Sequence, residues 1–168
     1  MTSPTMRLEA LSDWISKAAL ILSGLFLILM ALHVTVDVTL RYVIGTSFPG
    51  TLEIVSFYYM VGVVFLPLAY VELKQEHISV DVVVGRFSPR TQLVLYVFAS
   101  LLGLAYFGLL GYQSLLDAIR ATAQQETAMA NFNFYLWPSR WALPVGFAAM
   151  CLAILANIAK ALRLRQAL

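Results

Sequence analysis

The chain has 168 residues, of which 61% are hydrophobic and only 12% are charged, and its mean hydropathy is +0.82. A water-soluble domain needs more surface charge than this, so the composition excludes that class and indicates an integral membrane protein. The net charge of +2 is a topology signal rather than a sign of nucleic-acid binding, and one cysteine excludes a disulfide or cysteine-metal framework within one chain.

Four stretches without Asp, Glu, Lys or Arg are long enough to cross a membrane. They have 19, 18, 26 and 19 residues, and about 20 apolar residues span the hydrocarbon layer of a bilayer. We therefore predict an all-α integral membrane fold, residues 1–168, as a single domain with four transmembrane helices. The expected helices cover about 15–40, 50–71, 89–116 (to 125 if the helix continues) and 138–162.

The first two helices carry charges at their outer ends. Asp37 and Arg41 are four residues apart on the first helix, so they share a face and are expected to pair. Glu53 enters the first turn of the second helix, where the helix dipole favours an anion. We predict that Arg41 and Glu53 also meet across the turn as a structural clamp. The alternative is that this pair grips a neighbouring subunit.

A polar stretch follows the second helix. Val71 to Arg90 holds seven of the 22 charged or histidine residues of the chain, mixed with Ile, Val and Phe. These apolar residues are too few to span the bilayer, so we predict a short amphipathic segment at about 77–87 that lies in the cytoplasmic interface. His77 then lies beyond the inner end of the second helix, and Asp81 faces water.

Proline marks the starts of the later helices, because its missing N–H costs nothing in a first turn. The relevant sequences are "FPGTLE", "SPRTQ" and "WPSRW", and Ser88 is a candidate N-cap for the third helix. Trp137 lies at the end of an apolar run, as Trp14 and Trp141 do. We interpret these tryptophans as anchors at the level of the lipid headgroups.

The fourth helix has a stripe of small residues. Ala142, Gly146, Ala149, Ala153 and Ala156 recur at alternating spacings of four and three. Small residues let another helix approach closely, which is how helices associate where lipid offers no hydrophobic drive. The stripe predicts a packing partner, which is either this chain's own helices or a second protein.

The loop charges predict the orientation of the chain. The two tails and the second loop hold eight Lys and Arg residues, whereas the first and third loops hold three. Under the positive-inside rule, both termini are expected in the cytoplasm.

Catalytic motifs are missing from the sequence, so we do not expect an enzyme. A haem-binding membrane anchor uses paired histidines, but the predicted topology places His33 and His77 toward opposite faces of the membrane. His33 is expected to be a hydrogen-bonded interior or interfacial side chain rather than a ligand. A small autonomous transporter would need an acidic residue at the midplane, and none of the four apolar runs has one.

Several segments, in this order over about residues 15–160, resemble the small membrane subunit of tripartite ATP-independent periplasmic (TRAP) transporters. They are "DVTLRYVIGTSFPGTLE", "FLPLAY", "EHISVDVVVGRFSPR" and "FYLWPSRWALPVGFAAM". The positions that match recurrent residues of the family are Arg41, Glu53, His77, Ile78 and Asp81. An aromatic residue that usually precedes the glutamate is replaced here by Gly50 or Thr51.

The resemblance implies a sodium-coupled, binding-protein-dependent secondary transporter of the bacterial inner membrane that imports organic acids. The large permease subunit is expected to hold the solute and sodium sites, while the small subunit extends its scaffold and helps dock the periplasmic binding protein. The expected partners are thus the large subunit, transiently the solute-binding protein, and membrane lipids, with no nucleic acid and no cofactor. A haem- or quinone-binding membrane anchor of a redox enzyme is the alternative function.

Overall fold

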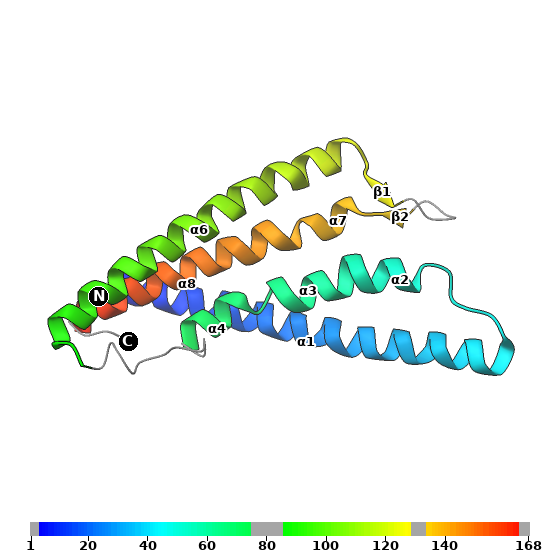
Figure 1. Cartoon of the computed structure of the whole chain (residues 1–168), viewed down its shortest axis with the longest axis horizontal. Coiled ribbons are helices and arrows are strands. Elements are labelled where there is room, and N and C mark those ends of the chain that lie inside the picture. Colours follow the sequence, from blue (N-terminus) through cyan, green and yellow to red (C-terminus); the bar gives the residue numbers. More distant parts are fainter. Residues whose placement is uncertain (1–3, 75–85, 129–133, 165–168) are drawn as a thin grey trace.

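The computed structural model describes residues 4–74, 86–128 and 134–164, and it is almost entirely helical. Four of its helical segments are long and apolar enough to cross a membrane, which confirms the predicted all-α, four-span fold. The first and last helices place the N- and C-termini at the same end of the molecule (Figure 1). We call this the terminal end, and the opposite end, with the α1–α2 turn and a small β-hairpin, the hairpin end.

The first span is a single long helix, α1 (Pro4–Ile44). Its 41 residues give a length of about 60 Å at 1.5 Å per residue, well beyond the thickness of a hydrocarbon core. The helix begins earlier than the expected residue 15, because no glycine or proline interrupts it after Pro4 until Gly24. It runs along the length of the molecule toward the hairpin end (Figure 1).

The second span is divided into four short pieces. They are α2 (Thr51–Ile54), a π-helical turn η1 (Val55–Tyr59), α3 (Met60–Phe65) and α4 (Leu68–Lys74). Pro67 separates α3 from α4, because it has no backbone N–H to donate to the carbonyl of Val63 one turn earlier. The hydroxyl of Ser23 on α1 donates to that carbonyl at 3.1 Å, so the neighbouring helix supplies the missing donor.

The third span is α6 (Pro89–Ala123), which begins as the sequence predicts. Ser88 is its N-cap and accepts a hydrogen bond from the backbone N–H of Thr91, and Pro89 occupies the first turn. The helix ends at Ala123, two residues before residue 125, the longer of the two limits that the sequence predicts. It is followed by the antiparallel strands β1 (Thr127–Ala128) and β2 (Phe134–Tyr135), which the sequence had not predicted.

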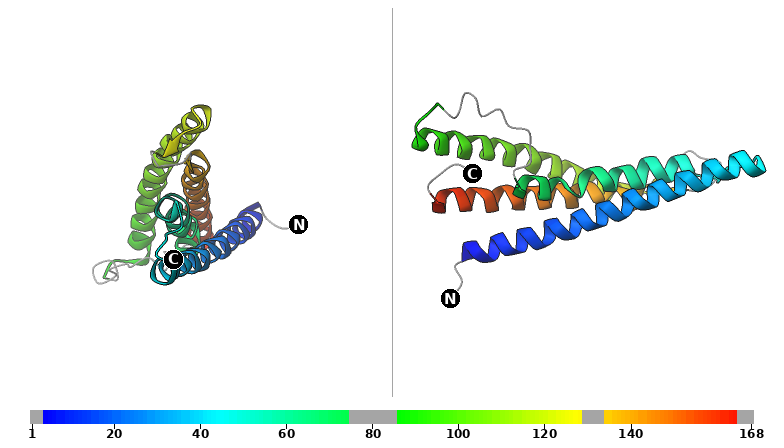
Figure 2. Two further views of the ribbon diagram at one scale, coloured as in Figure 1. Left: turned by 90° about the vertical axis from the view of Figure 1, so that its right-hand side faces the viewer. Right: turned by 90° about the horizontal axis from the view of Figure 1, so that it is seen from below.

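The fourth span consists of α7 (Trp137–Arg140) and α8 (Ala142–Leu164). α8 packs against α6, α4, α1 and α3, so it is the central helix of the bundle (Figure 2). The buried core includes Ala69 of α4 with Ala149 and Ala153 of α8, and Ile15 of α1 packs against this cluster. The centre of this cluster therefore consists of small side chains of α4 and α8, with the larger Ile15 of α1 packed against them.

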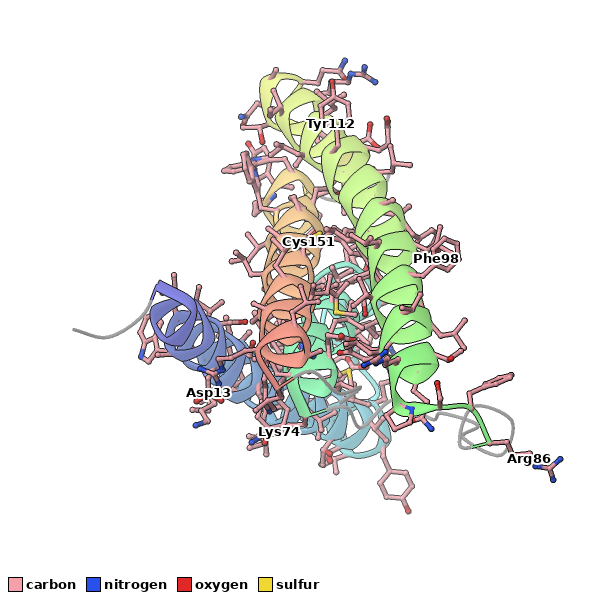
Figure 3. The ribbon with its side chains drawn as sticks, turned by 90° about the vertical axis from the view of Figure 1, so that its left-hand side faces the viewer. Asp13, Lys74, Arg86, Phe98, Tyr112 and Cys151 are labelled. Atoms are coloured by element: carbon pink, nitrogen blue, oxygen red, sulfur yellow. The ribbon has the colours of Figure 1, made fainter. Side chains whose placement is uncertain are left out.

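The outward faces of α1 and α6 are apolar and exposed. Half or more of the surface of large side chains such as Ile21, Ile28, Val94 and Leu109 is exposed. Phe98 projects from α6 away from the bundle (Figure 3). Surfaces of this kind are stable only against lipid or another protein.

Candidate functional site

The turn between α1 and α2 is organised around one buried carboxylate. The Asp37 side chain is only 4% exposed, and its Oδ2 lies 2.8 Å from Nη2 of Arg41. Its Oδ1 accepts a hydrogen bond of 2.7 Å from the backbone N–H of Phe48. The predicted Asp37–Arg41 pair is confirmed, and the same carboxylate also fixes the connecting loop.

The predicted clamp between Arg41 and Glu53 is wrong. Among the described residues, the ion pair that Arg41 makes is the one with Asp37. Asp37 is one helical turn away on the same face and is already held in place by Phe48, so Arg41 reaches it without ordering a second segment. Glu53 lies in the first turn of α2, as predicted, and its side chain is partly exposed.

His33 belongs to a polar cluster that joins α1 to the second span. Its Nδ1 lies 3.4 Å from the hydroxyl of Tyr59, and its Nε2 lies 3.4 Å from the hydroxyl of Thr51. Its ring meets the edges of the Phe48 and Tyr59 rings. Both ring nitrogens thus face protein hydroxyls, as expected of an interior histidine rather than a haem ligand. The other histidine, His77, lies outside the described residues, as does Asp81.

An ion pair and a hydrogen bond hold the β-hairpin side of the hairpin end, and no pattern in the sequence predicted them. The Arg140 guanidinium makes two bonds to the Glu126 carboxylate, of 2.8 Å from Nε and 2.6 Å from Nη2. The indole of Trp141 donates to the Thr122 hydroxyl at 3.0 Å. These contacts join the end of α6 and the residues just after it to α7 and to the residue that links α7 with α8. No local spacing indicates them, because Glu126 and Arg140 are 14 residues apart across the hairpin.

The two halves of the hairpin end are also joined to each other. The hydroxyl of Tyr58 in η1 donates to the backbone carbonyl of Tyr135 in β2 at 2.6 Å. The ring of Tyr58 meets the edge of the Phe134 ring. The turn after α1 and the β-hairpin before α7 therefore belong to one connected surface.

The small-residue stripe of α8 lies inside this chain. Gly146, Ala149 and Ala153 are buried, whereas Ala142 at the start of the helix is partly exposed. A Cβ on Gly146 would overlap the backbone carbonyl of Phe65, so the close approach of α8 to α3 requires glycine there. Of the two alternatives for the stripe, the structure shows packing within the chain. Trp137 lies partly buried at the start of α7.

Two of the hollows among the described residues border α8. One, of about 350 Å³, is apolar and lies between α6 and α8, where Phe107, Trp141, Phe147 and Cys151 line it. The other, of about 190 Å³, lies at the terminal end among side chains of α1, α4 and α8. In the part of the chain that the structure describes, no group of three or more His, Cys, Asp or Glu could hold a metal ion.

Comparison with protein families gave one match. Residues 30–164 match the family described as the DctQ component of tripartite ATP-independent periplasmic transporters. The comparison with curated proteins gave no match, and the comparison with solved structures gave none. The match covers the last three spans completely and the first span from residue 30 onward.

Proposed function

The chain belongs to the DctQ component family of TRAP transporters, and from this membership we propose that it braces the large permease subunit of a sodium-coupled importer of organic acids. The family is a transporter component and not an enzyme family. With four apolar spans the chain is a multi-pass membrane protein, and we place it in the bacterial inner membrane.

The observation that carries this proposal is the family match over residues 30–164, together with the exposed faces of α1 and α6. A transport site in lipid needs polar or ionisable groups that face a cavity. The cavity between α6 and α8 has a lining that is almost entirely apolar. This lining supports the proposal that the solute and sodium sites lie in the large subunit and that this chain serves as its scaffold.

We propose that both termini face the cytoplasm, so that the hairpin end faces the periplasm. This orientation follows from the excess of Lys and Arg in the tails and the second loop. The joined surface around Asp37, Tyr58 and the β-hairpin then lies where a periplasmic binding protein approaches. Glu53 is partly exposed on α2 and is available to a partner.

Reconstitution in vesicles tests the proposed function. Uptake of a radiolabelled organic acid is expected only when the chain is combined with its large subunit, the binding protein and an inward sodium gradient. The purified chain alone is expected to bind no acid. Uptake by this chain without its companions, or a haem spectrum of the purified chain, would overturn the proposal.

Glu53 can be tested in the same assay. Glu53→Ala is expected to lower uptake severalfold at limiting binding protein, because it removes a carboxylate from the docking surface. Asp117→Ala is the matched control, since Asp117 is a partly exposed carboxylate toward the same end whose nearest cation is Arg120 of its own helix, 3.8 Å away. Equal effects of the two substitutions would remove the special role proposed for Glu53.

A further inference from the structure

We propose that the hollow at the terminal end is a binding site for the phosphate group of an anionic phospholipid. We call it the lysine pocket, and its lining residues come from three helices: Asp13 of α1, Leu73 and Lys74 of α4, and Ala156, Asn157 and Lys160 of α8. Figure 3 looks onto this end of the molecule and shows Asp13 and Lys74 close together. The proposal requires only that the chain lies in a membrane, and it does not depend on the transporter partners.

A buried amide builds the pocket. Asn157 is 3% exposed, and its Nδ2 donates to the backbone carbonyl of Glu72 at 2.8 Å and to the Glu72 carboxylate at 3.3 Å. These bonds hold the end of α4 against α8. Lys74 follows Glu72 by two residues and Lys160 follows Asn157 by three, so the same contact brings both lysines to one pocket.

The charges of the pocket favour an anion. Asp13 is its one acidic lining residue, and its Oδ2 lies 2.7 Å from the ammonium of Lys17. Lys74 and Lys160 are exposed and make no ion pair with any other residue that the structure describes. The ammonium of Lys74 lies 5.7 Å from the centre of the Tyr70 ring. Two lysines and one aspartate line the pocket, and the charges of Lys17 and Glu72 beside it cancel, so an excess of one positive charge remains.

The surroundings indicate a lipid rather than a soluble anion. Trp14 is adjacent to Asp13 and 70% exposed, and tryptophan on a membrane protein concentrates at the level of the headgroups. From there toward the middle of the bilayer, α1 exposes Ile21, Leu25 and Ile28. A phosphate in the lysine pocket would thus have an apolar surface beside it for acyl chains. Basic pockets between transmembrane helices are known to bind anionic headgroups.

Lipid binding to the full chain in detergent tests the proposal. The number of phosphatidylglycerol molecules retained, and their affinity, are measured by native mass spectrometry, with phosphatidylcholine as the neutral comparison. Each lysine near a headgroup contributes about fivefold in affinity, so Lys74→Gln with Lys160→Gln is expected to weaken phosphatidylglycerol binding about 25-fold. Phosphatidylcholine binding and the unfolding midpoint in neutral detergent are expected to stay unchanged.

The matched control is Arg86→Gln with Arg90→Gln. Both arginines are exposed near the start of α6, outside the lysine pocket, and Arg86 projects away from it (Figure 3). The control removes the same charge from the same end of the bundle, and less than a threefold effect is expected. If the two double variants weaken binding equally, the effect is general surface charge and the proposed site is overturned.

Asp13→Asn supplies a test of opposite sign. Removing this carboxylate frees Lys17 and is expected to strengthen phosphatidylglycerol binding about fivefold. Weaker binding by Asp13→Asn would show that the pocket does not hold an anion. Competition with inorganic phosphate distinguishes a lipid headgroup from a free phosphate ion as the ligand. Millimolar inorganic phosphate is not expected to displace the lipid. Displacement at that concentration would overturn the assignment to a lipid.

Discussion

The helices α6 and α8 are nearly equally apolar, yet they occupy different environments. None of the residues in the most apolar 18-residue stretch of α6 is buried within the chain, whereas half of those in the fourth span are. Half of the ten buried residues of α8 are Ala or Gly, and the larger ones include Phe147, Met150 and Ile154. The large apolar side chains that α6 exposes are Leu, Val, Ile, Phe and Tyr.

The difference teaches that hydropathy and burial are separate properties in a membrane protein. Lipid is as apolar as a leucine side chain, so burying a leucine between helices gains little. Small residues let backbones approach and gain dispersion contacts and hydrogen bonds instead. Hydropathy therefore indicates which segments cross the membrane, and the size of the side chains on each face indicates which segments pack together.

The largest expected effect is that of Gly146→Ala on α8. The added Cβ would overlap the backbone carbonyl of Phe65, which cannot move without shifting α3. We expect the free energy of unfolding to fall by about 1–3 kcal/mol, as for overpacked cores, and a thermal melt in detergent would show it. An unchanged midpoint would mean that α8 and α3 are not in the close contact that the structure shows.

Ser23→Ala is expected to have a smaller effect. It removes the hydroxyl of α1 that donates to the carbonyl of Val63, the residue four positions before Pro67. Hydrogen bonds between transmembrane helices contribute on average about 0.6 kcal/mol and at most about 1.7 kcal/mol, so the loss should fall in this range. Thr35→Ala is the control, because the Thr35 hydroxyl bonds to the Ala31 carbonyl of its own helix. Equal losses would remove the special role of the Ser23 contact.

Features that depend on local spacing were predictable from the sequence. The four spans follow from charge-free runs, the Ser88 cap from its position before Pro89, and the Asp37–Arg41 pair from a spacing of four. Each depends on residues within a few turns of one another, where helix geometry fixes distances.

Features that depend on contacts across the bundle were not predictable in the same way. The prediction of an Arg41–Glu53 clamp was wrong because Arg41 pairs with the nearer carboxylate of Asp37 on its own helix. The Glu126–Arg140 bonds and the Ser23–Val63 contact join residues 14 and 40 apart. Helix spacing does not specify which faces of separate helices meet, so no spacing in the sequence indicates either contact. The break at Pro67 was the one available hint that a donor from elsewhere was needed.

The α1–α2 turn extends the comparison to polar groups, because Asp37 is buried while its partner Arg41 is 60% exposed. Asp37→Ala removes the acceptor for the Phe48 N–H, and we expect faster hydrogen exchange at that amide. Asp37→Asn keeps an acceptor and should retain most of the protection. Arg41→Gln removes the guanidinium but leaves the Asp37 acceptor in place, so it should reduce the protection of the Phe48 amide much less than Asp37→Ala does. Loss of protection in all three variants would mean that the ion pair, and not the buried acceptor, holds the turn.

The smallest expected effect lies on α6 and has the opposite sign to Gly146→Ala. A Cβ added to Gly108 would meet no atom of this chain within 4 Å. Gly108 also lies in the interior of α6, where glycine is less favourable than alanine by about 0.5–1 kcal/mol. Gly108→Ala is therefore expected to raise the unfolding midpoint of the isolated chain slightly. Because Gly108 lines the apolar cavity between α6 and α8, a lowered midpoint would show that the two helices close further than the structure indicates. A midpoint raised for the isolated chain but lowered for its complex with the large subunit would instead place the permease against this part of α6.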